Sequence, residues 1–313
     1  MLRYIVERLS IMVPTIIVLS IILFVLMRLT PGSPMQPMAA NANPLPPEAQ
    51  ANLAKEWGLD KPIWEQYIVY VGKAAHLDFG NSYVYRSRSV NEILGPTFIV
   101  SLELGAIALA LAIVVGGLLG IVAAMNQNGP VDYICTFVAM IGVSIPNFVM
   151  AVFLILILVL GLHLLPNTGG WQHPVDWIMP TITLALGPLS IIARYTRSSM
   201  VDVIRSDYVR TARAKGMAER QVIFTHVLKN ALIPPLTILG PLVAAVMTGS
   251  PFVELIFRVP GMGRYFIQSI TARDYPMIMA VFLFYGIFLQ VMNLAVDVLY
   301  GVVDPRIRFG GAD

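Results

Sequence analysis

The chain has 313 residues, of which 57% are hydrophobic and 12% are charged, and its mean hydropathy is +0.74. Soluble domains average about 45–50% apolar and about 25% charged residues, so the composition excludes an ordinary soluble protein and indicates an integral protein of the lipid bilayer. The net charge of +3 leaves no broad basic surface for nucleic acid, and the single cysteine, Cys135, excludes an internal disulfide framework.

The first apolar run predicts a membrane-spanning helix near the N-terminus. Residues 11–29 are apolar apart from small polar side chains and Arg28, and at 1.5 Å per residue they can cross a hydrocarbon core of about 30 Å. A cleaved signal peptide is the alternative, because residues 40–42 read Ala-Asn-Ala and resemble a cleavage site. The run exceeds the roughly 7–15 apolar residues of a signal peptide, which favours an uncleaved anchor over residues 1–30.

A polar segment, residues 31–96, predicts a small helical subdomain outside the membrane between the first two spans. Prolines open one helix near residues 48–57 and another near residues 63–75, as expected for proline in a first helical turn. Their aromatic residues could form a local core, but their amphipathic rings slightly favour the membrane interface. These residues are Trp57, Trp64, Tyr67 and Tyr70.

Five further apolar segments complete a prediction of six transmembrane helices in an all-α integral membrane protein. They are residues 98–125, 131–160, 177–193, 236–257 and 277–300. The last five spans form a core over residues 97–303, followed by a cytoplasmic tail, residues 304–313. Basic residues cluster between the fourth and fifth spans and agree in sign with both termini, so the positive-inside rule places the N- and C-termini in the cytoplasm.

Two interruptions of the apolar pattern are candidates for a transport pathway or gate. The third span contains Ser-Ile-Pro-Asn at residues 144–147, where proline removes a backbone hydrogen bond; a tolerated kink and a bend that lines a pathway are equal alternatives. Residues 253–264 read Val-Glu-Leu-Ile-Phe-Arg-Val-Pro-Gly-Met-Gly-Arg, which predicts a tight turn near membrane depth, or else an ordinary loop. The candidate pathway residues are Pro146, Asn147, Glu254, Pro260, Gly261 and Gly263.

Glu103, Glu254 and Asp297 are ionisable residues in or beside predicted spans. Such groups usually face the interior of a helix bundle and often mark a pathway for a solute. Each carboxylate could equally be a structural partner for an interior arginine or a backbone amide.

One long charged passage, residues 206–234, interrupts the second half of the chain. Ser206 and Asp207 predict a helix start, and Gly216 predicts a left-handed end after Lys215. A second helix is expected to restart near Glu219 and meet Pro234. One face of the first helix has a small centre and basic edges suited to another protein's groove; it carries Tyr208, Thr211, Ala212 and Lys215. A solvated basic loop that only satisfies the positive-inside rule is the alternative.

Residues 208–216 read Tyr-Val-Arg-Thr-Ala-Arg-Ala-Lys-Gly and are followed by Asn230-Ala-Leu-Ile-Pro234. This pattern resembles the cytoplasmic "EAA" loop of ABC-importer permeases in its peptide-transporter form, with residues 210–212 in the Glu-Ala-Ala places and Gly216 as the matching glycine. The turn at residues 253–264 resembles a further signature of this family. The resemblance runs from Arg3 to Arg308 and is closest to the B-type subunits of oligopeptide permeases.

This resemblance implies the type I ABC importer permease fold and a role as one transmembrane half of a peptide importer in the bacterial inner membrane. It implies a second homologous permease, two ATP-binding subunits that hold ATP and Mg, an extracytoplasmic solute-binding protein and a peptide substrate. The segment that contacts the ATPase would lie in a loop over residues 198–232. Its candidate residues are Tyr208, Arg210, Thr211, Ala212, Arg213, Ala214, Lys215, Gly216 and Glu219.

Other chemistry has little support in the sequence. The chain has no Gly-x-x-x-x-Gly-Lys-Ser/Thr phosphate loop and no His-Glu-x-x-His pair, so we assign no catalytic, cofactor-binding or metal-binding residue. We therefore expect no ATP hydrolysis by the chain itself. A membrane-embedded hydrolase is the alternative from another class, because catalytic triads assemble from distant positions. A permease for nickel, glutathione or another small solute is the alternative among transporters.

Overall fold

A computed structural model describes residues 2–29, 46–85, 88–166 and 169–303, and these residues are helical apart from loops and one isolated bridge between Asn81 and Ser89. The predicted all-α class is therefore confirmed. The tail, residues 304–313, and the start of the polar segment, residues 30–45, lie outside the described part of the chain.

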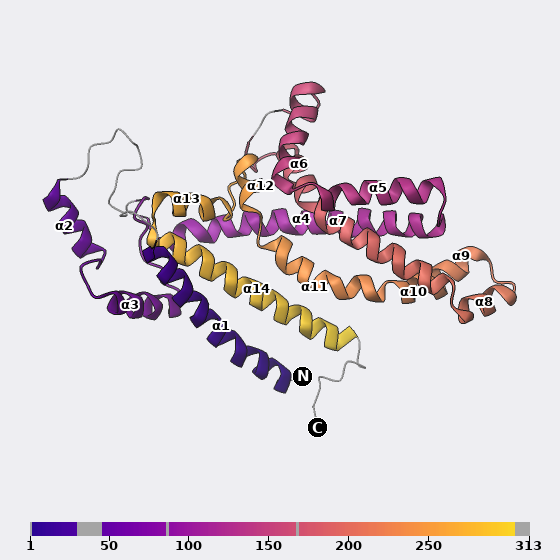
Figure 1. Cartoon of the computed structure of the whole chain (residues 1–313), viewed down its shortest axis with the longest axis horizontal. Helices are drawn as coiled ribbons and strands as arrows, with labels where there is room; N and C mark the ends of the chain where they lie inside the picture. The colour runs from indigo at the N-terminus through magenta and orange to yellow at the C-terminus, as the bar shows by residue number, and fades with distance from the viewer. Residues whose placement is uncertain (1, 30–45, 86–87, 167–168, 304–313) are drawn as a thin grey trace.

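Among the described residues, five stretches are long and apolar enough to cross a membrane, namely Val6–Leu29, Val90–Met125, Pro174–Ile204, Ile233–Ile256 and Tyr275–Val296. They lie on α1 (Leu2–Leu29), α4 (Val90–Met125), α7 (Pro174–Ile204), α11 (Ile233–Met247) with α12 (Pro251–Ile256), and α14 (Tyr275–Val303). A sixth span is counted if a bent pair of helices is taken as one. Figure 1 shows α1, α4, α7, α11 and α14 side by side as an elongated layer of helices.

Shorter helices connect these spans. The polar segment contains α2 (Pro47–Glu56) and α3 (Ile63–Ala75), close to the two predicted helices. After α7 come α8 (Asp207–Ala214), α9 (Glu219–Gln221), the π-helix η2 (Val222–Val227) and α10 (Leu228–Ala231), and α13 (Arg264–Ala272) precedes α14. We call the described residues 46–85 and 88–89 the insertion; it lies at one end of the layer, while α8 and α9 lie at the other (Figure 1).

The third predicted span is sharply broken. It consists of α5 (Pro130–Ser144), then α6 (Asn147–Leu154) and the π-helix η1 (Ile155–Gly161), and the two parts are bent by 111°. Pro146 stands at the N-cap of α6, where its missing N–H costs nothing. The bend is much larger than a tolerated kink, and α6 projects out of the layer that contains α4 and α7 (Figure 1).

Other predicted spans also have different limits in the structure, and the fourth, predicted over residues 177–193, extends over Pro174–Ile204. The second begins at Val90 instead of residue 98, because Ser89 accepts a hydrogen bond from the Glu92 N–H and Glu92 accepts one from the Ser89 N–H, a complete capping box. The fifth span, predicted over residues 236–257, is interrupted after Met247, and Gly249 there has a positive φ of 79°.

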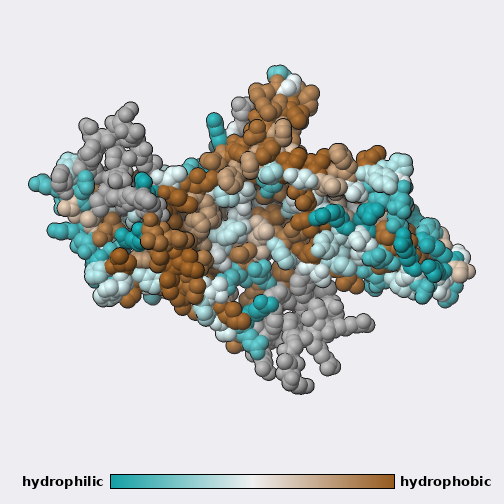
Figure 2. Space-filling model, in the orientation of Figure 1, coloured by the Kyte–Doolittle hydropathy of each residue, from teal (hydrophilic) through white to brown (hydrophobic). Residues whose placement is uncertain are grey.

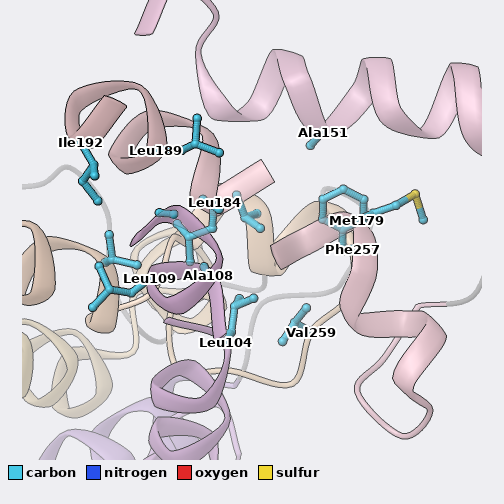
Figure 3. Packing of buried hydrophobic residues seen from close by; sticks show 14 of the residues in the cluster. Leu104, Ala108, Leu109, Ala151, Met179, Leu184, Leu189, Ile192, Phe257 and Val259 are labelled. Atoms are coloured by element: carbon cyan, nitrogen blue, oxygen red, sulfur yellow. The ribbon is translucent and has the colours of Figure 1, made fainter. Parts of the chain in front are cut away.

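The main core lies where α4 packs against α7. A Cβ at Gly116 would come within 2.6 Å of the Leu189 carbonyl oxygen, and a Cβ at Gly120 within 2.6 Å of the Ala193 carbonyl oxygen. These two glycines therefore let the helix backbones approach closely, as small residues do between helices in lipid. Figure 3 shows Leu104 and Ala108 among the side chains gathered in this core.

The insertion packs onto the ends of α1 and α14. Trp57 stacks on Tyr83 with ring centroids 3.9 Å apart, and the hydroxyl groups of Tyr67 and Ser20 are 2.8 Å apart. Tyr70 contributes to the same packing. These three aromatic residues thus take part in local packing, one of the two alternatives, whereas Trp64 has an exposed fraction of 66%. The position at the membrane interface stays a prediction.

Candidate functional site

The segment from residue 206 to residue 219, which we call the coupling segment, has the predicted helix and the predicted break. The helix α8 ends at Ala214, Lys215 is its C-cap, and Gly216 has a φ of 75°. The role of Ser206 differs from the prediction. Its backbone occupies the N-cap, but its hydroxyl donates to the Val203 carbonyl oxygen at 2.6 Å and makes no bond to the helix that follows.

The two sides of α8 have different surroundings. Val209 and Ala212 are buried. The remaining side chains of the predicted site are exposed: Tyr208, Arg210, Thr211, Arg213, Ala214, Lys215 and Glu219. The prediction that Ala212 forms the small centre of the docking face is therefore wrong, because Ala212 packs inward. The outward face of α8 is basic and polar. Figure 2 shows a hydrophilic surface over this end of the molecule.

The inner side of α8 is held by residues from several helices. Val209 and Ala212 belong to a buried cluster with Met200 of α7 and Ala124 of α4. Residues of η2 and α10 complete the cluster. The coupling segment is thus not a free loop, because burial of these apolar side chains fixes it against the ends of two long helices.

An ion pair closes the break after α8. The guanidinium of Arg213 donates to the Glu219 carboxylate through Nη2 at 2.6 Å and through Nε at 3.1 Å. This hydrogen-bonded pairing lowers the pKa of Glu219 below 4.5. Both side chains remain partly exposed, at 38% for Arg213 and 58% for Glu219, so solvent weakens the attraction.

We expect Glu219→Gln to loosen the coupling segment while lowering overall stability by no more than about 1 kcal/mol, as is usual for an exposed pair. A group with a lowered pKa stabilises the folded state above its unfolded pKa and loses that contribution as the pH falls through the folded value. Amide exchange of residues 207–219 should therefore be faster in the variant at pH 7, and the difference should vanish well below pH 4.5.

The control for this measurement is Glu65→Gln, which removes the exposed Glu65–Lys61 pair of the insertion and should leave exchange of the coupling segment unchanged. Equal exchange rates in Glu219→Gln and the unaltered chain at pH 7 would show that the pair does not hold the break.

A second ion pair near the α8 end of the molecule was not predicted from the sequence; we call it the Asp132–Arg197 clasp. Arg197 of α7 donates to both oxygens of Asp132, from Nε and from Nη2, each at 2.6 Å, and the Asn128 N–H donates to the same carboxylate at 2.9 Å. Asp132 is almost completely buried. The pair joins the start of α5 to α7, and only an expected helix start with an acidic first turn at Asp132 could have hinted at it.

Glu254, a predicted pathway residue, lies at the centre of a buried hydrogen-bond network, and its place beside a pathway stays a prediction. Its side chain is 0% exposed, and it accepts hydrogen bonds from the Ser101 hydroxyl at 2.9 Å and from the Gly263 N–H at 2.6 Å. Ser101, on α4, also accepts a hydrogen bond from the Met262 N–H at 2.8 Å. We call this group, Ser101, Glu254 and residues 260–263, the Glu254 turn.

The glycines of this turn make room for the carboxylate. A Cβ at Gly261 would lie 2.4 Å from Glu254 Oε2, and a Cβ at Gly263 would lie 2.8 Å from the same atom. Pro260, beside them, is partly buried. The sequence left Glu254 as either a pathway residue or a structural partner of an arginine or a backbone amide. The described contacts support a structural partner of backbone amides.

The other pathway candidates lie next to this turn. Pro146 and Asn147 start α6, which packs against α12, and the rings of Phe148 and Phe252 are 6.0 Å apart between their centroids. The structure therefore brings the broken span and the Glu254 turn together. Glu103 lies apart from the network and accepts a hydrogen bond from Trp171 Nε1 at 2.9 Å on the surface.

The two candidate regions are connected through one helix. Ser101 in the Glu254 turn and Ala124 beneath the coupling segment are both on α4, and 23 residues of helix at 1.5 Å each separate them by about 35 Å. The regions are too distant to form one chemical site. Among the described residues, no group of three or more His, Cys, Asp or Glu side chains could hold a metal ion.

Two family models of transport proteins together match almost the whole chain. A family model described as "binding-protein-dependent transport system inner membrane component" matches residues 116–309, and the model of the N-terminal part of such components matches residues 1–110. The limit between the two matches falls within α4, which is one continuous helix.

Two relatives have similar sequences over their full length. The chain is 44% identical over 308 residues to the dipeptide transport system permease protein of Bacillus subtilis (strain 168), covering 98% of each chain. It is 41% identical over 311 residues to the oligopeptide transport system permease protein of Escherichia coli (strain K12), covering 99% of this chain and all of the relative. Among solved structures, that of an amino acid ABC transporter with histidines matches with a TM-score of 0.51 and 19% identity, over 68% of this chain and 95% of the other.

Proposed function

Because this chain belongs to the family of binding-protein-dependent transport system inner membrane components, we propose that it is one transmembrane subunit of an ATP-driven peptide importer. The fold is that of type I ABC importer permeases, with five long apolar helices and one broken span. The observation that carries the proposal is the similarity of more than 40% identity to dipeptide and oligopeptide permeases over nearly the full length.

The chain is a multi-pass membrane protein, and we propose that it lies in the bacterial inner membrane with both termini in the cytoplasm. Basic residues of the coupling segment support this orientation, because Arg210 and Lys215 are exposed at the end of the layer that bears α8. The insertion would then face the outside, where a solute-binding protein delivers its cargo.

Members of this family work with ATPase and binding-protein partners, and we propose the specific assembly of a second homologous permease and two ATP-binding subunits. The exposed basic face of α8 suits docking to an ATP-binding subunit, since Val209 and Ala212 anchor its other side. ATP and Mg would be bound by those subunits, and ATP hydrolysis would be theirs. No cofactor is assigned to this chain.

In the proposed transporter, movement of α8 must be transmitted to the pathway of the peptide. The buried cluster under α8 contains residues of α4 and α7, and α4 continues to the Glu254 turn beside the broken span. Movement of α8 on nucleotide binding would therefore reach both ends of the bundle through packed helices. This gives a physical basis for alternating an inward-facing and an outward-facing cavity.

Reconstitution of the complete transporter tests this proposal. We expect the full-length chain, gently purified from its membrane, to bring down a second permease and ATP-binding subunits that are identified by mass spectrometry. In proteoliposomes, this complex should accumulate a labelled dipeptide or oligopeptide only with ATP and the binding protein. Excess unlabelled peptide should abolish the signal, whereas nickel or glutathione should not.

Two results would contradict the proposal. Competition by nickel or glutathione without competition by peptide would favour the alternative transporter. Substrate cleavage by the purified chain without nucleotide would favour a hydrolase.

A further inference from the structure

A cavity of about 530 Å³ lies where the insertion meets the ends of α1 and α14. Its walls include Phe24 and Met27 of α1 and Met279 of α14, which are apolar residues of membrane-spanning helices. Residues of α2, of α3 and of the loops that follow these two helices line the side of the insertion. The side of the spans is mainly apolar, with Arg28 as its charged residue, and the side of the insertion is mixed polar and apolar.

Basic side chains are in excess in this lining. They are Arg28, Lys55, Lys61 and Lys73, against the acidic Glu56 and Asp78. Lys61 is already paired with the Glu65 carboxylate at 2.7 Å, which leaves Arg28, Lys55 and Lys73 against the two acidic residues. The cavity therefore suits an anionic group.

Arg28 is the residue that makes the cavity chemically unusual. Its guanidinium carbon lies 5.4 Å from the ring centroids of Phe24 and Tyr275, and its Nε is buried without a hydrogen-bond partner among the described residues. The hydroxyl of Tyr70, which also lines the cavity, is likewise buried and without a partner there. Buried donors are rarely left unpaired in folded proteins, so two of them in one lining indicate a missing acceptor.

The position of α3 places this cavity at the level of lipid headgroups. Tyr67 and Tyr70 face the bundle, whereas Trp64 and Ile68 are more than half exposed, at 66% and 60%. A helix with an exposed aromatic and aliphatic edge beside the end of a span is typical of the membrane interface. Figure 1 shows α3 beside the end of α1, where Arg28 is located.

We propose that this cavity binds the phosphate of an anionic phospholipid headgroup, with Arg28 and Tyr70 as donors. The phosphate would accept from the guanidinium and the hydroxyl, while Lys55 and Lys73 at the insertion side attract the negative charge. The first atoms of the glycerol and acyl chains would lie against Phe24, Met27 and Met279. Arginine suits this role because its fork of donors matches phosphate oxygens.

Native mass spectrometry of the full-length chain in its transport complex tests the proposal. The complex is exchanged into bilayer nanodiscs that contain phosphatidylglycerol and phosphatidylcholine with identical acyl chains, and the lipids retained on release are counted. We expect selective retention of phosphatidylglycerol, and we expect Arg28→Gln to reduce it about tenfold, since a charge-assisted hydrogen bond is lost. Arg28→Lys should retain part of the selectivity.

Arg220→Gln is the matched control, because Arg220 also lies over an aromatic ring, that of Phe224, but at the α8 end. It should leave phosphatidylglycerol retention unchanged. Lys73→Gln, at an exposed position of the same lining, provides a second variant if Arg28→Gln does not assemble, and it should reduce retention about threefold because a surface charge contributes less.

Three results would overturn the proposal. The first is equal retention of the two lipids by the unaltered complex. The second is retention that neither Arg28→Gln nor Lys73→Gln reduces. The third is displacement of the lipid by soluble glycerol phosphate or by a free peptide at equal concentration, which would assign the cavity to a soluble anion or to a peptide carboxylate.

Discussion

We expect Glu254→Ala to destabilise the protein strongly and to abolish transport. The substitution removes both acceptor oxygens from a fully buried site, so the Ser101 hydroxyl and the Gly263 N–H each lose a partner. An unsatisfied buried donor costs about 1–3 kcal/mol, so the loss should be roughly 2–6 kcal/mol. This is a large part of a typical folding free energy of about 5–15 kcal/mol.

Thermal unfolding followed by fluorescence-detected chromatography measures this effect. Ser101→Ala should have an intermediate effect, because it removes one donor to Glu254 and the acceptor of the Met262 N–H. Glu103→Ala, on the same helix, should change the midpoint little, since only a surface bond to Trp171 is lost. A Glu254→Ala protein with an unaltered midpoint and normal uptake would show that the Glu254 turn does not depend on its carboxylate.

The second large effect is expected at Gly216, where Gly216→Val should uncouple ATP hydrolysis from peptide uptake in the proposed transporter. The backbone φ of 75° is unfavourable for residues with a side chain, and the cost is about 1–2 kcal/mol, greater for a β-branched one. A Cβ at this position would have no neighbour within 4 Å, so the whole penalty comes from the backbone. The segment should therefore leave its native conformation while the chain still inserts.

Uptake and ATP hydrolysis of the reconstituted complex are measured in parallel for a series of Gly216 variants. Gly216→Asn should be mildest, because asparagine tolerates left-handed backbone, Gly216→Ala should be intermediate, and Gly216→Val should lower uptake at least about tenfold while hydrolysis continues. Gly117→Val is the control, since that site also has no neighbour within 4 Å but has ordinary helical backbone. Normal peptide uptake by Gly216→Val at normal expression would refute this role for the coupling segment.

The sequence predicted features that depend on neighbours along the chain. The apolar runs located the long helices, because a helix that crosses a bilayer must satisfy its backbone internally and present apolar side chains. Local signals also located α8, from Asp207 in its first turn to Gly216 after its end. Most of the coupling residues were predicted to be at the surface, and only Ala212 was misplaced, because the helical period alone does not show which side a neighbouring helix covers.

Features that depend on distant partners could not be predicted. Asp274 is buried and accepts a hydrogen bond from the Ser82 hydroxyl, and also one from the Tyr83 N–H at 3.1 Å, about 190 residues away in the chain. These contacts fasten the insertion to the start of α14, but no local pattern distinguishes Asp274 from a surface aspartate. The hydrogen bonds of Glu254 could not be predicted for the same reason, because its partner Ser101 is only one of several serines in apolar segments.

The size of the bend at Pro146 was also beyond local reasoning. A proline interrupts a helix wherever it occurs, but the angle is fixed by what the two halves pack against. Here Gly142 fits so closely to α7 that a Cβ would lie 2.2 Å from the Leu186 carbonyl oxygen, and Phe148 reaches Phe252 on α12. Both halves thus pack against α7, but only the half after Pro146 also packs against α12.

The length of α4 has a mechanical consequence. Its 36 residues extend about 54 Å, well beyond a hydrocarbon core of about 30 Å, and no proline interrupts it between Ser101 and Ala124. An unbroken helix over this stretch ties Ala124 to Ser101, so a displacement of α4 moves both residues together. If the chain couples ATP hydrolysis to uptake as proposed, a compound that immobilises α4 at any point between these two residues should block the coupling segment and the Glu254 turn together.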